Sequence, residues 1–174
     1  TMVLMLDLDG FKIVNDIASH DAGDKLLNIM AKRLKKMDMV CSIASMGVDK
    51  FIIIYQPSDE WEGTVGEIAE MILSTCRKPF RFDGHDFSLT GSVGIALYPD
   101  DGHDIGVLIK NADIAMKRAK EKKESSYYLY TKDLSKQILK RLNLERDLRD
   151  GIEREELVLY YQPRIHIESG KIES

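Results

Sequence analysis

The sequence predicts an α+β fold, an α/β sandwich in which helices cover one face of a central sheet. Two observations support this prediction. Short β-rich runs alternate with longer segments of helical periodicity, in the order β-α-β-β-α-β-α-β. Hydrophobic residues make up 44% of the 174 residues, which is enough for one buried core. The length therefore fits one domain followed by the start of another.

Local patterns predict each element of the first part of the chain. Met2–Leu8 is an apolar run that is typical of a buried strand. Apolar residues three and four positions apart then predict a helix over Gly23–Met37. Two short β-rich runs follow, Val40–Ala44 and Phe51–Tyr55. They lie on either side of a glycine turn at Gly47–Lys50, which indicates a hairpin.

The same alternation continues through the middle of the chain. Pro79 ends the first helical segment there, and two glycines in the next strand, Gly91 and Gly94, would permit close packing against a helix. The expected elements are a helix over Trp61–Arg77, a strand over Phe87–Leu97, a helix over Asp104–Lys122 and an edge strand over Ser126–Tyr130.

The C-terminal part has a different pattern. Residues 133–155 are highly charged with few apolar positions, which suits an exposed connecting helix, although a capping helix of the same domain fits the periodicity equally well. Residues 156–174 then begin a new β-rich pattern. We expect a domain over residues 1–132, a connecting helix over 133–155 and the first strand region of a second domain over 156–174.

The bulk composition excludes several classes of function. A net charge of −4 gives no general affinity for nucleic acid or for an anionic membrane. The longest apolar run is too short to span a bilayer, so we expect no membrane contact by this segment, although a longer parent protein could still be attached to a membrane. Cys41 and Cys76 lack the spacing of a disulfide framework, which indicates reduced thiols and a cytoplasmic location. Metal-ligand spacing is missing from the four histidines, His20, His85, His103 and His166.

Acidic residues at two turns are candidate metal ligands. Asp7 and Asp9 close the first strand, and alternation puts both on one face with Leu8 on the other. Such carboxylates are ligands that Mg²⁺ prefers, and Asp49 in the hairpin is a candidate second ligand. For an isolated Asp-x-Asp pair, a helix-capping role is the better interpretation.

The residues after the first strand are candidates for binding a nucleotide. A glycine followed by Phe11 and Lys12 offers close backbone approach, exposed N–H groups and a positive charge to phosphate. Asn15 and Asp24 offer an amide and a carboxylate, which together can bind the edge of guanine. Taken singly, each has a simpler interpretation as a solvated loop or helix-terminal residue. Their joint order and spacing favour a nucleotide site.

These motifs resemble those of the GGDEF family, the diguanylate cyclase domain of cyclic-di-GMP signalling. The resemblance covers residues 3–130 and implies a ferredoxin-like palm, as in nucleotidyl cyclases, with a mainly antiparallel sheet and packed helices. The family's amino-terminal helix, with its Leu-Thr-Gly-Leu signature, is missing from this sequence. The matching motifs are Asp7-Leu8-Asp9-Gly10-Phe11-Lys12, Asn15-Asp16, His20, Gly23-Asp24, the hairpin turn, Ser92–Ala96 with Tyr98-Pro99, and Ala112–Met116 with Ala119-Lys120.

The resemblance also implies a role for individual residues. Asp7, the Leu8 carbonyl and Asp49 would hold Mg²⁺ or Mn²⁺. In active members two domains face each other, each holding one GTP, and each ribose 3′-hydroxyl attacks the other's α-phosphate, so a homodimer is implied. The positions that would contact GTP are Asn15 and Asp24 at the guanine and Phe11, Lys12, Gly47 and Lys120 toward the phosphates and turn.

The family's five-residue signature is degenerate here, as Gly47-Val48-Asp49-Lys50-Phe51. Val48 replaces a glycine, and a branched side chain resists positive φ and fills space beside the nucleotide. Lys50 replaces an acid, so it can neither coordinate a second cation nor accept a proton. Glu124 stands where active members have an arginine on the phosphates. We therefore expect no intact catalytic residues and little or no cyclase activity.

Two further resemblances concern ligands and partners. The family's inhibitory product site is an Arg-x-x-Asp ahead of the turn, and because Asp38 and Cys41 occupy those positions we expect no such site. Leu144–Arg149 and Glu156–Pro163 resemble the opening of an EAL phosphodiesterase domain. The Glu-Ala-Leu motif and metal ligands of that domain would lie after Ser174, so the parent protein either hydrolyses cyclic-di-GMP or merely binds it.

Three hypotheses on function follow, in order of preference. The first is a regulatory module that binds GTP and a divalent cation and signals to a downstream EAL domain. The second is an active diguanylate cyclase that tolerates the altered turn. The third is a structural or dimerising domain with an empty pocket.

Overall fold

The computed structural model describes the chain except for residues 19, 39, 59–61, 83–84, 123–124, 161, 166, 168, 170–171 and 174. The chain divides into two compact units, Thr1–Ser135 and Lys136–Ser174. The first unit contains every residue that the sequence assigns to the nucleotide site. None of the helices among the described residues is long and apolar enough to cross a membrane.

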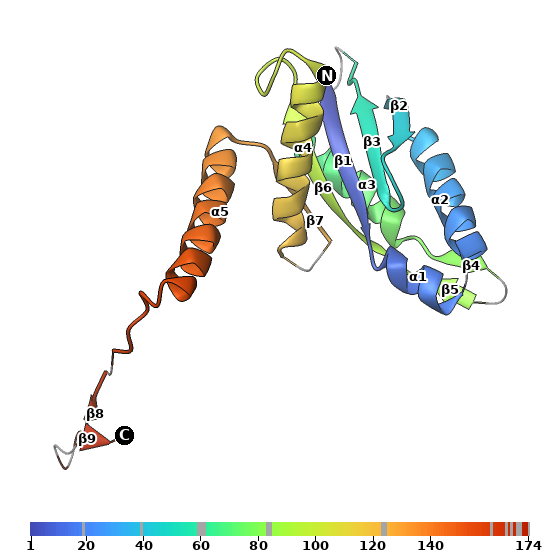
Figure 1. Cartoon of the computed structure of the whole chain (residues 1–174). Coiled ribbons are helices and arrows are strands. Elements are labelled where there is room, and N and C mark those ends of the chain that lie inside the picture. The colour runs from blue at the N-terminus through green and yellow to red at the C-terminus, as the bar shows by residue number, and fades with distance from the viewer. Residues whose placement is uncertain are drawn as a thin grey trace. The chain divides into compact units, whose positions relative to one another are not determined.

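A five-stranded sheet in the order β2-β3-β1-β6-β7 forms the centre of the first unit (Figure 1). The middle strand β1 (Met2–Asp9) pairs antiparallel with β3 (Lys50–Tyr55) on one side and β6 (Thr90–Leu97) on the other. The edges are β2 (Val40–Ser45), antiparallel to β3, and β7 (Ser126–Leu129), parallel to β6. The mainly antiparallel sheet, the hairpin and the last edge strand are as predicted.

Helices cover both faces of this sheet, so the prediction of helices on one face is wrong. Helices α2 (His20–Lys35) and α3 (Val65–Arg77) lie on one face, and α4 (Ile105–Lys120) lies on the other (Figure 1). The physical reason is that β1 and β6 are buried along nearly their whole length instead of at alternate residues. A strand that is apolar on both sides needs a packed layer on each.

Each helical layer encloses its own apolar cluster. The α2 and α3 side holds the larger cluster, which includes Leu4, Leu6, Leu8, Met30, Ile53, Ile72 and Ile95. The α4 side holds a smaller one, formed by Val3, Met5, Ile52, Ala96, Leu108, Ala112 and Met116. Cys76 is fully buried in the larger cluster, and its burial raises the pKa of the thiol to about 12. The central strand therefore contributes alternate residues to two cores.

Several helix ends differ from the predicted ones. A short helix α1 (Phe11–Ile17) precedes α2, which begins before the predicted Gly23. The N terminus of α3 is fixed by a capping box in which the Glu67 N–H donates to Thr64 Oγ1 at 3.3 Å and the Thr64 N–H donates to the Glu67 carboxylate at 2.6 Å. The predicted start of that helix, Trp61, lies outside the described residues.

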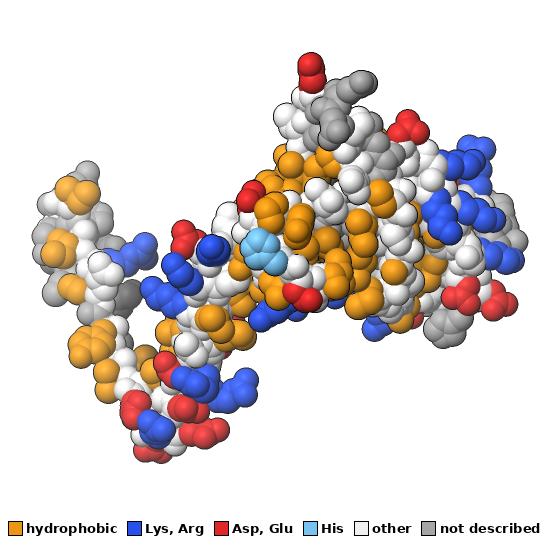
Figure 2. Space-filling view, turned by 90° about the horizontal axis from the view of Figure 1, so that it is seen from above, with side chains coloured by type: hydrophobic (Ala, Val, Ile, Leu, Met, Phe, Trp, Pro, Cys, Tyr) orange, Lys and Arg blue, Asp and Glu red, His pale blue; other side chains and the backbone are white. Residues whose placement is uncertain are grey.

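The predicted strand over Phe87–Leu97 consists of two separate elements. Its first residue belongs to β5 (His85–Phe87), which pairs with β4 (Phe80–Phe82) in a small two-stranded sheet. Residues Thr90–Leu97 form β6, and the two residues between β5 and β6 belong to neither strand. After β6, the loop and first turn of α4 leave Tyr98, Ile105 and Val107 about half exposed. Figure 2 shows hydrophobic side chains gathered on the face that includes this loop.

The second unit contains most of α5 (Lys132–Glu153) and two paired strands, β8 (Arg164–Ile165) and β9 (Ile172–Glu173). The helix lies where a connecting helix is predicted. Among the described residues of the β-rich run from residue 156, strands form only at β8 and β9. Residues 157–160 between them and the helix have no regular structure and are exposed.

Helix α4 approaches the sheet very closely at Gly94 on β6. A Cβ atom built there would lie 2.0 Å from the Ala112 carbonyl oxygen and 2.1 Å from the Met116 backbone nitrogen, both on α4. Backbone atoms of a helix in the core cannot move aside at low cost. The close packing predicted for this glycine is confirmed, and it fixes α4 directly on the sheet.

We predict that Gly94→Ala lowers the free energy of unfolding of the first unit by at least about 3 kcal/mol, because the added methyl group must displace helix backbone. Urea denaturation followed by circular dichroism measures the change. The matched control is Gly151→Ala on α5, where the nearest atom would be the Glu156 carboxylate at 3.7 Å. That control should leave the transition of the first unit unchanged, and an equal stability of the two variants would contradict the packing described here.

Candidate functional site

The candidate site begins with two aspartates at the end of β1. Val3 and Met5 belong to the cluster under α4 and Leu8 to the opposite cluster, so alternation places Asp7 and Asp9 on the α4 face. Asp7 is 2% exposed. A carboxylate at such a depth needs a cation or hydrogen-bond donors close by.

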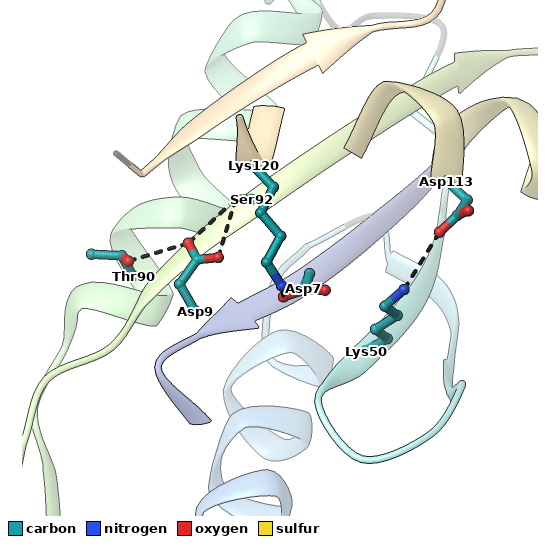
Figure 3. Close-up of polar contacts among 7 residues, drawn as sticks. All are labelled: Asp7, Asp9, Lys50, Thr90, Ser92, Asp113 and Lys120. Atoms are coloured by element: carbon teal, nitrogen blue, oxygen red, sulfur yellow. Dashed lines mark hydrogen bonds and ion pairs between the residues drawn. The ribbon is translucent and has the colours of Figure 1, made fainter. Parts of the chain in front are cut away.

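Lys120, from the last turn of α4, supplies the cation for Asp7. Its Nζ lies 2.5 Å from Asp7 Oδ1, and the lysine side chain extends from α4 over β6 to this carboxylate on β1 (Figure 3). Burial lowers the pKa of Lys120, but the hydrogen bond that its ammonium group donates to Asp7 and the charges of Asp7, Asp9 and Asp49 outweigh this effect and raise that pKa above its ordinary value. Three carboxylates of the candidate site therefore act on one ammonium group.

Asp9 has neutral partners instead. Its carboxylate accepts hydrogen bonds from Thr90 Oγ1 at 3.2 Å and from Ser92 Oγ at 3.3 Å, both on β6 (Figure 3). Burial raises the pKa of Asp9, and these two hydroxyl donors partly offset the effect. The two aspartates of one short motif thus have different environments, one beside a lysine and one beside hydroxyl groups.

The hairpin turn is tied to β1 next to these aspartates. The Met46 N–H donates to the Lys50 carbonyl at 2.9 Å, which closes the turn, and the Leu8 N–H donates to the Asp49 carbonyl at 2.9 Å. In an antiparallel ladder the N–H and C=O of one residue point to the same neighbour, so the Leu8 carbonyl also points toward the turn. The three expected metal-ligand positions, Asp7, Leu8 and Asp49, are thereby brought together.

The strain expected at Val48 is not found. Gly47 takes the positive φ of the turn, at 116°, and the only described residue other than glycine with a positive φ is Glu155. Val48 is 64% exposed at the tip of the hairpin. Its effect on a bound nucleotide would therefore be the space that its side chain fills and not a distorted backbone.

Lys50 faces the same volume as Asp7. The two residues are directly opposite in the β1–β3 ladder, and Ser92 is opposite Asp7 on the other side. The Lys50 side chain points to α4, where its Nζ lies 3.6 Å from Asp113 Oδ1 (Figure 3). Lys117 Nζ lies 2.7 Å from the other oxygen of that carboxylate, so two lysines share Asp113.

The expected guanine-binding pair lies where α1 meets α2. Asn15 Oδ1 is buried, and it has no hydrogen-bond partner among the described residues. A Cβ built on Gly23 would lie 1.9 Å from this oxygen, so a larger residue would have to displace the Asn15 side chain. Asp24, the next residue, is exposed. The sequence pattern contains Gly23 but does not reveal its role, which depends on a contact between separate helices.

The positions expected near the phosphates differ in accessibility. Phe11 is 2% exposed and belongs to the larger core cluster, which leaves only its backbone for a ligand. Lys12 is exposed on α1. Gly10, in the left-handed conformation with φ 79°, turns the chain from β1 into that helix. Glu124 lies outside the described residues.

The donor set at the end of β1 is of a kind that suits Mg²⁺ or Mn²⁺. Two carboxylates and a backbone carbonyl are oxygen ligands, and Mg²⁺ is usually bound by one or two carboxylates together with substrate phosphates. No cluster of three metal-binding side chains occurs within the described part of the chain. The protein alone would therefore hold the ion weakly, and Lys120 already contacts one of the two carboxylates.

Comparison with known protein families is consistent with this geometry. The family described as diguanylate cyclase, GGDEF domain, matches residues 1–126. The signaling protein YkoW of Bacillus subtilis (strain 168) is 38% identical over 173 residues, which are 99% of this chain and 22% of that protein. MucR of Pseudomonas aeruginosa, described as a bifunctional diguanylate cyclase/cyclic di-GMP phosphodiesterase, is 35% identical over 169 residues, which are 97% of this chain and 24% of that protein.

A solved structure shares the fold. The GGDEF domain of TpbB (YfiN) from Pseudomonas aeruginosa superimposes with a TM-score of 0.71 and 30% sequence identity, over 79% of this chain and 81% of that one. The present chain spans less than a quarter of the length of the two curated relatives described above.

We predict that Lys120→Met lowers the free energy of unfolding by about 1–3 kcal/mol in EDTA, because Asp7 is left buried without its cation. This loss is smaller than that for breaking a fully buried ion pair, since the Lys120 side chain is half exposed. Millimolar Mg²⁺ should restore part of the loss. The control Lys117→Met removes an exposed pair and should cost no more than about 0.5 kcal/mol. Urea denaturation of each variant provides the measurement, and equal losses would contradict the special role of Lys120.

Proposed function

Because the chain belongs to the GGDEF family of cyclic-di-GMP signalling domains, we propose that it binds GTP as a regulatory module and forms little or no cyclic-di-GMP. The proposal separates two properties of the site. In this proposal Asn15 and Asp24 recognise the nucleotide, whereas the hairpin that would support the reaction carries a cation, Lys50, where an acid is expected.

The observation that carries the binding half of the proposal is the buried amide of Asn15. Its oxygen has no partner among the described residues, and an unpaired buried polar atom costs about 1–3 kcal/mol. Asp24 follows the glycine against which this amide packs. An amide and a carboxylate together offer both a donor and acceptors, which matches guanine, whose edge carries N–H groups next to a carbonyl. A bound base would satisfy the amide.

The phosphates and a cation would lie at the end of β1. Asp7, the Leu8 carbonyl and Asp49 would hold Mg²⁺ or Mn²⁺, which would neutralise phosphate charge when bound. Lys12, Lys120 and the backbone of Phe11 and Gly47 are available to the phosphates. The position of α1 directly after β1 supports this arrangement, since guanine and phosphate contacts then belong to consecutive segments of chain.

The observation that carries the catalytic half is the environment of Lys50. Its ammonium group pairs with Asp113 and has no lone pair with which to bind a metal or accept a proton. Losing one element of transition-state stabilisation typically costs ~10²–10³ in rate. Positioning and charge neutralisation are most of what phosphoryl transfer requires, so a reversed charge beside the reacting groups is severe.

A downstream EAL-like domain is the proposed recipient of the signal. Residues Leu157, Val158, Leu159 and Tyr160 are exposed by 62% to 91%. An apolar run that protrudes into solvent supports the idea that these residues form the first strand of a further domain, in which they would be buried. The name of MucR joins a cyclase and a phosphodiesterase in one protein. In this proposal α5 transmits nucleotide occupancy to that domain, and a homodimer remains a proposed assembly.

A structural domain with an empty pocket is the second candidate. The ion pairs of Asp7 with Lys120 and of Asp113 with Lys50 and Lys117 favour it, because they neutralise the site without any ligand. This candidate predicts that changes at Asn15 and Asp24 leave the behaviour of the full protein unaltered.

We predict that GTP binds in magnesium buffer and that Asp24→Ala weakens binding at least about tenfold, because a charged hydrogen-bond acceptor for guanine is lost. Isothermal titration calorimetry measures both dissociation constants. Asp21→Ala is the matched control, since it removes an exposed acid from the first turn of the same helix. An absence of heat at millimolar GTP would exclude the regulatory proposal.

We also predict that the parental chain makes no cyclic-di-GMP above background, whereas Val48→Gly combined with Lys50→Glu raises the rate by ~10² or more. The physical reason is that the double change restores open space and an acid at the turn. Labelled GTP and chromatography of the products provide the assay. Rapid product formation by the parental chain would show that Lys50 is compatible with catalysis.

A further inference from the structure

Lys120 contacts the Asp7 carboxylate, which a divalent cation would bind, and Lys50 is the residue opposite Asp7 in the β1–β3 ladder. Resting on the proposed function, we propose that Lys50 and Lys120 together replace the charge of that cation, so that the pocket binds a nucleoside triphosphate nearly as well without Mg²⁺ as with it. Whether GTP binding to this pocket requires Mg²⁺ is a property separate from GTP binding itself.

Lys120 already occupies the position of a counter-ion. Its Nζ contacts Asp7 Oδ1 at 2.5 Å, a distance at which no hydrated cation fits between them, and Asp7 is 2% exposed. A divalent ion that binds Asp7 must displace this ammonium group or share the carboxylate with it. With an ammonium in contact, the carboxylate no longer repels an approaching phosphate as a bare anion would.

Lys50 adds a second positive charge to the same volume. It is directly opposite Asp7 in the ladder, where the Cβ atoms of facing residues are typically ~4.5–5.5 Å apart. Its contact with Asp113 is loose, at 3.6 Å, and Lys117 holds the other oxygen of that carboxylate at 2.7 Å. The Lys50 side chain is 31% exposed. An incoming phosphate can therefore attract its ammonium group without leaving Asp113 unpaired.

Lys50 stands where the family has an acid, and this replacement changes the local charge by the same amount as the binding of one Mg²⁺. Replacing a carboxylate by an ammonium group adds two positive charges, and one Mg²⁺ brings two. The described residues contain no three-ligand cluster that would hold a metal in the absence of phosphate. The chain thus combines a weak set of metal ligands with a fixed pair of cations beside them, which is the combination that a reduced metal requirement needs.

The test is calorimetry with GTP on the full 174-residue chain, once in EDTA and once in magnesium. For the parental chain we expect two dissociation constants within about threefold of each other, since fixed ammonium groups supply the attraction. For Lys50→Glu we expect binding in EDTA to weaken by at least about tenfold, with recovery in magnesium. Lys32→Glu on α2 is the matched control, because it makes the same net charge change at an exposed position on the opposite side of the sheet.

Each outcome decides between the two proposals. GTP binding that requires magnesium in the parental chain would overturn the lysine inference and leave the regulatory proposal intact. No binding in either buffer would overturn both. Equal binding of Lys50→Glu and the parental chain in EDTA would also overturn the inference.

A second variant guards against misfolding of Lys50→Glu, which places an acid opposite Asp7. Lys50→Gln keeps the side-chain length without a charge and should show a smaller loss of EDTA binding in the same direction. Thermal unfolding with MgCl₂ alone gives a readout that needs no nucleotide, because a ligand of the folded state raises its melting temperature. Magnesium should raise that temperature more for Lys50→Glu than for the parental chain, and an equal rise would count against the proposal.

Discussion

The close approach of α4 to the sheet at Gly94 decides which cation meets which carboxylate. Backbone atoms of Ala112 and Met116 leave no room for a side chain on β6. Asp113 directly follows Ala112 on α4, and Lys120 lies one helical turn after Met116. Because α4 is held at this position on the sheet, Asp113 comes within reach of Lys50, and Lys120 comes within reach of Asp7. A packing constraint in the core thus determines the electrostatics of the candidate site.

The candidate site consists of two parts with different physical character. One is a charged region where β1, the hairpin and α4 meet, and there Asp7 contacts Lys120 while Asp113 contacts Lys50 and Lys117. The other lies between α1 and α2, where the Asn15 amide oxygen is buried without a partner. In the first region Asp7 and Asp113 already have cationic partners without a ligand, whereas the second region has an unmet hydrogen-bonding requirement. This contrast is why nucleotide recognition and catalysis can be separated in one domain.

Membership of a family with a known reaction does not establish that reaction in this chain. The family match covers the whole first unit apart from its last residues. The fold and the approximate positions of the site residues follow from it, because they depend on the core pattern that related sequences share. Catalysis depends on individual charges at the hairpin, and the Gly47–Phe51 signature differs at two of five positions from the family pattern. Function is therefore argued from the site and not from the fold.

The sequence by itself determined the mainly antiparallel sheet, the hairpin, the edge strand and the shared face of Asp7 and Asp9, because strand alternation and turn chemistry are local properties. It did not determine the helical layer on each face or the conformation of Val48. The contacts of Lys50 with Asp113, of Lys120 with Asp7 and of Gly23 with Asn15 join residues that are 63, 113 and 8 positions apart, respectively. Only the tertiary structure decided these pairings, since they arise when separate elements pack and no local pattern encodes which side chains then meet.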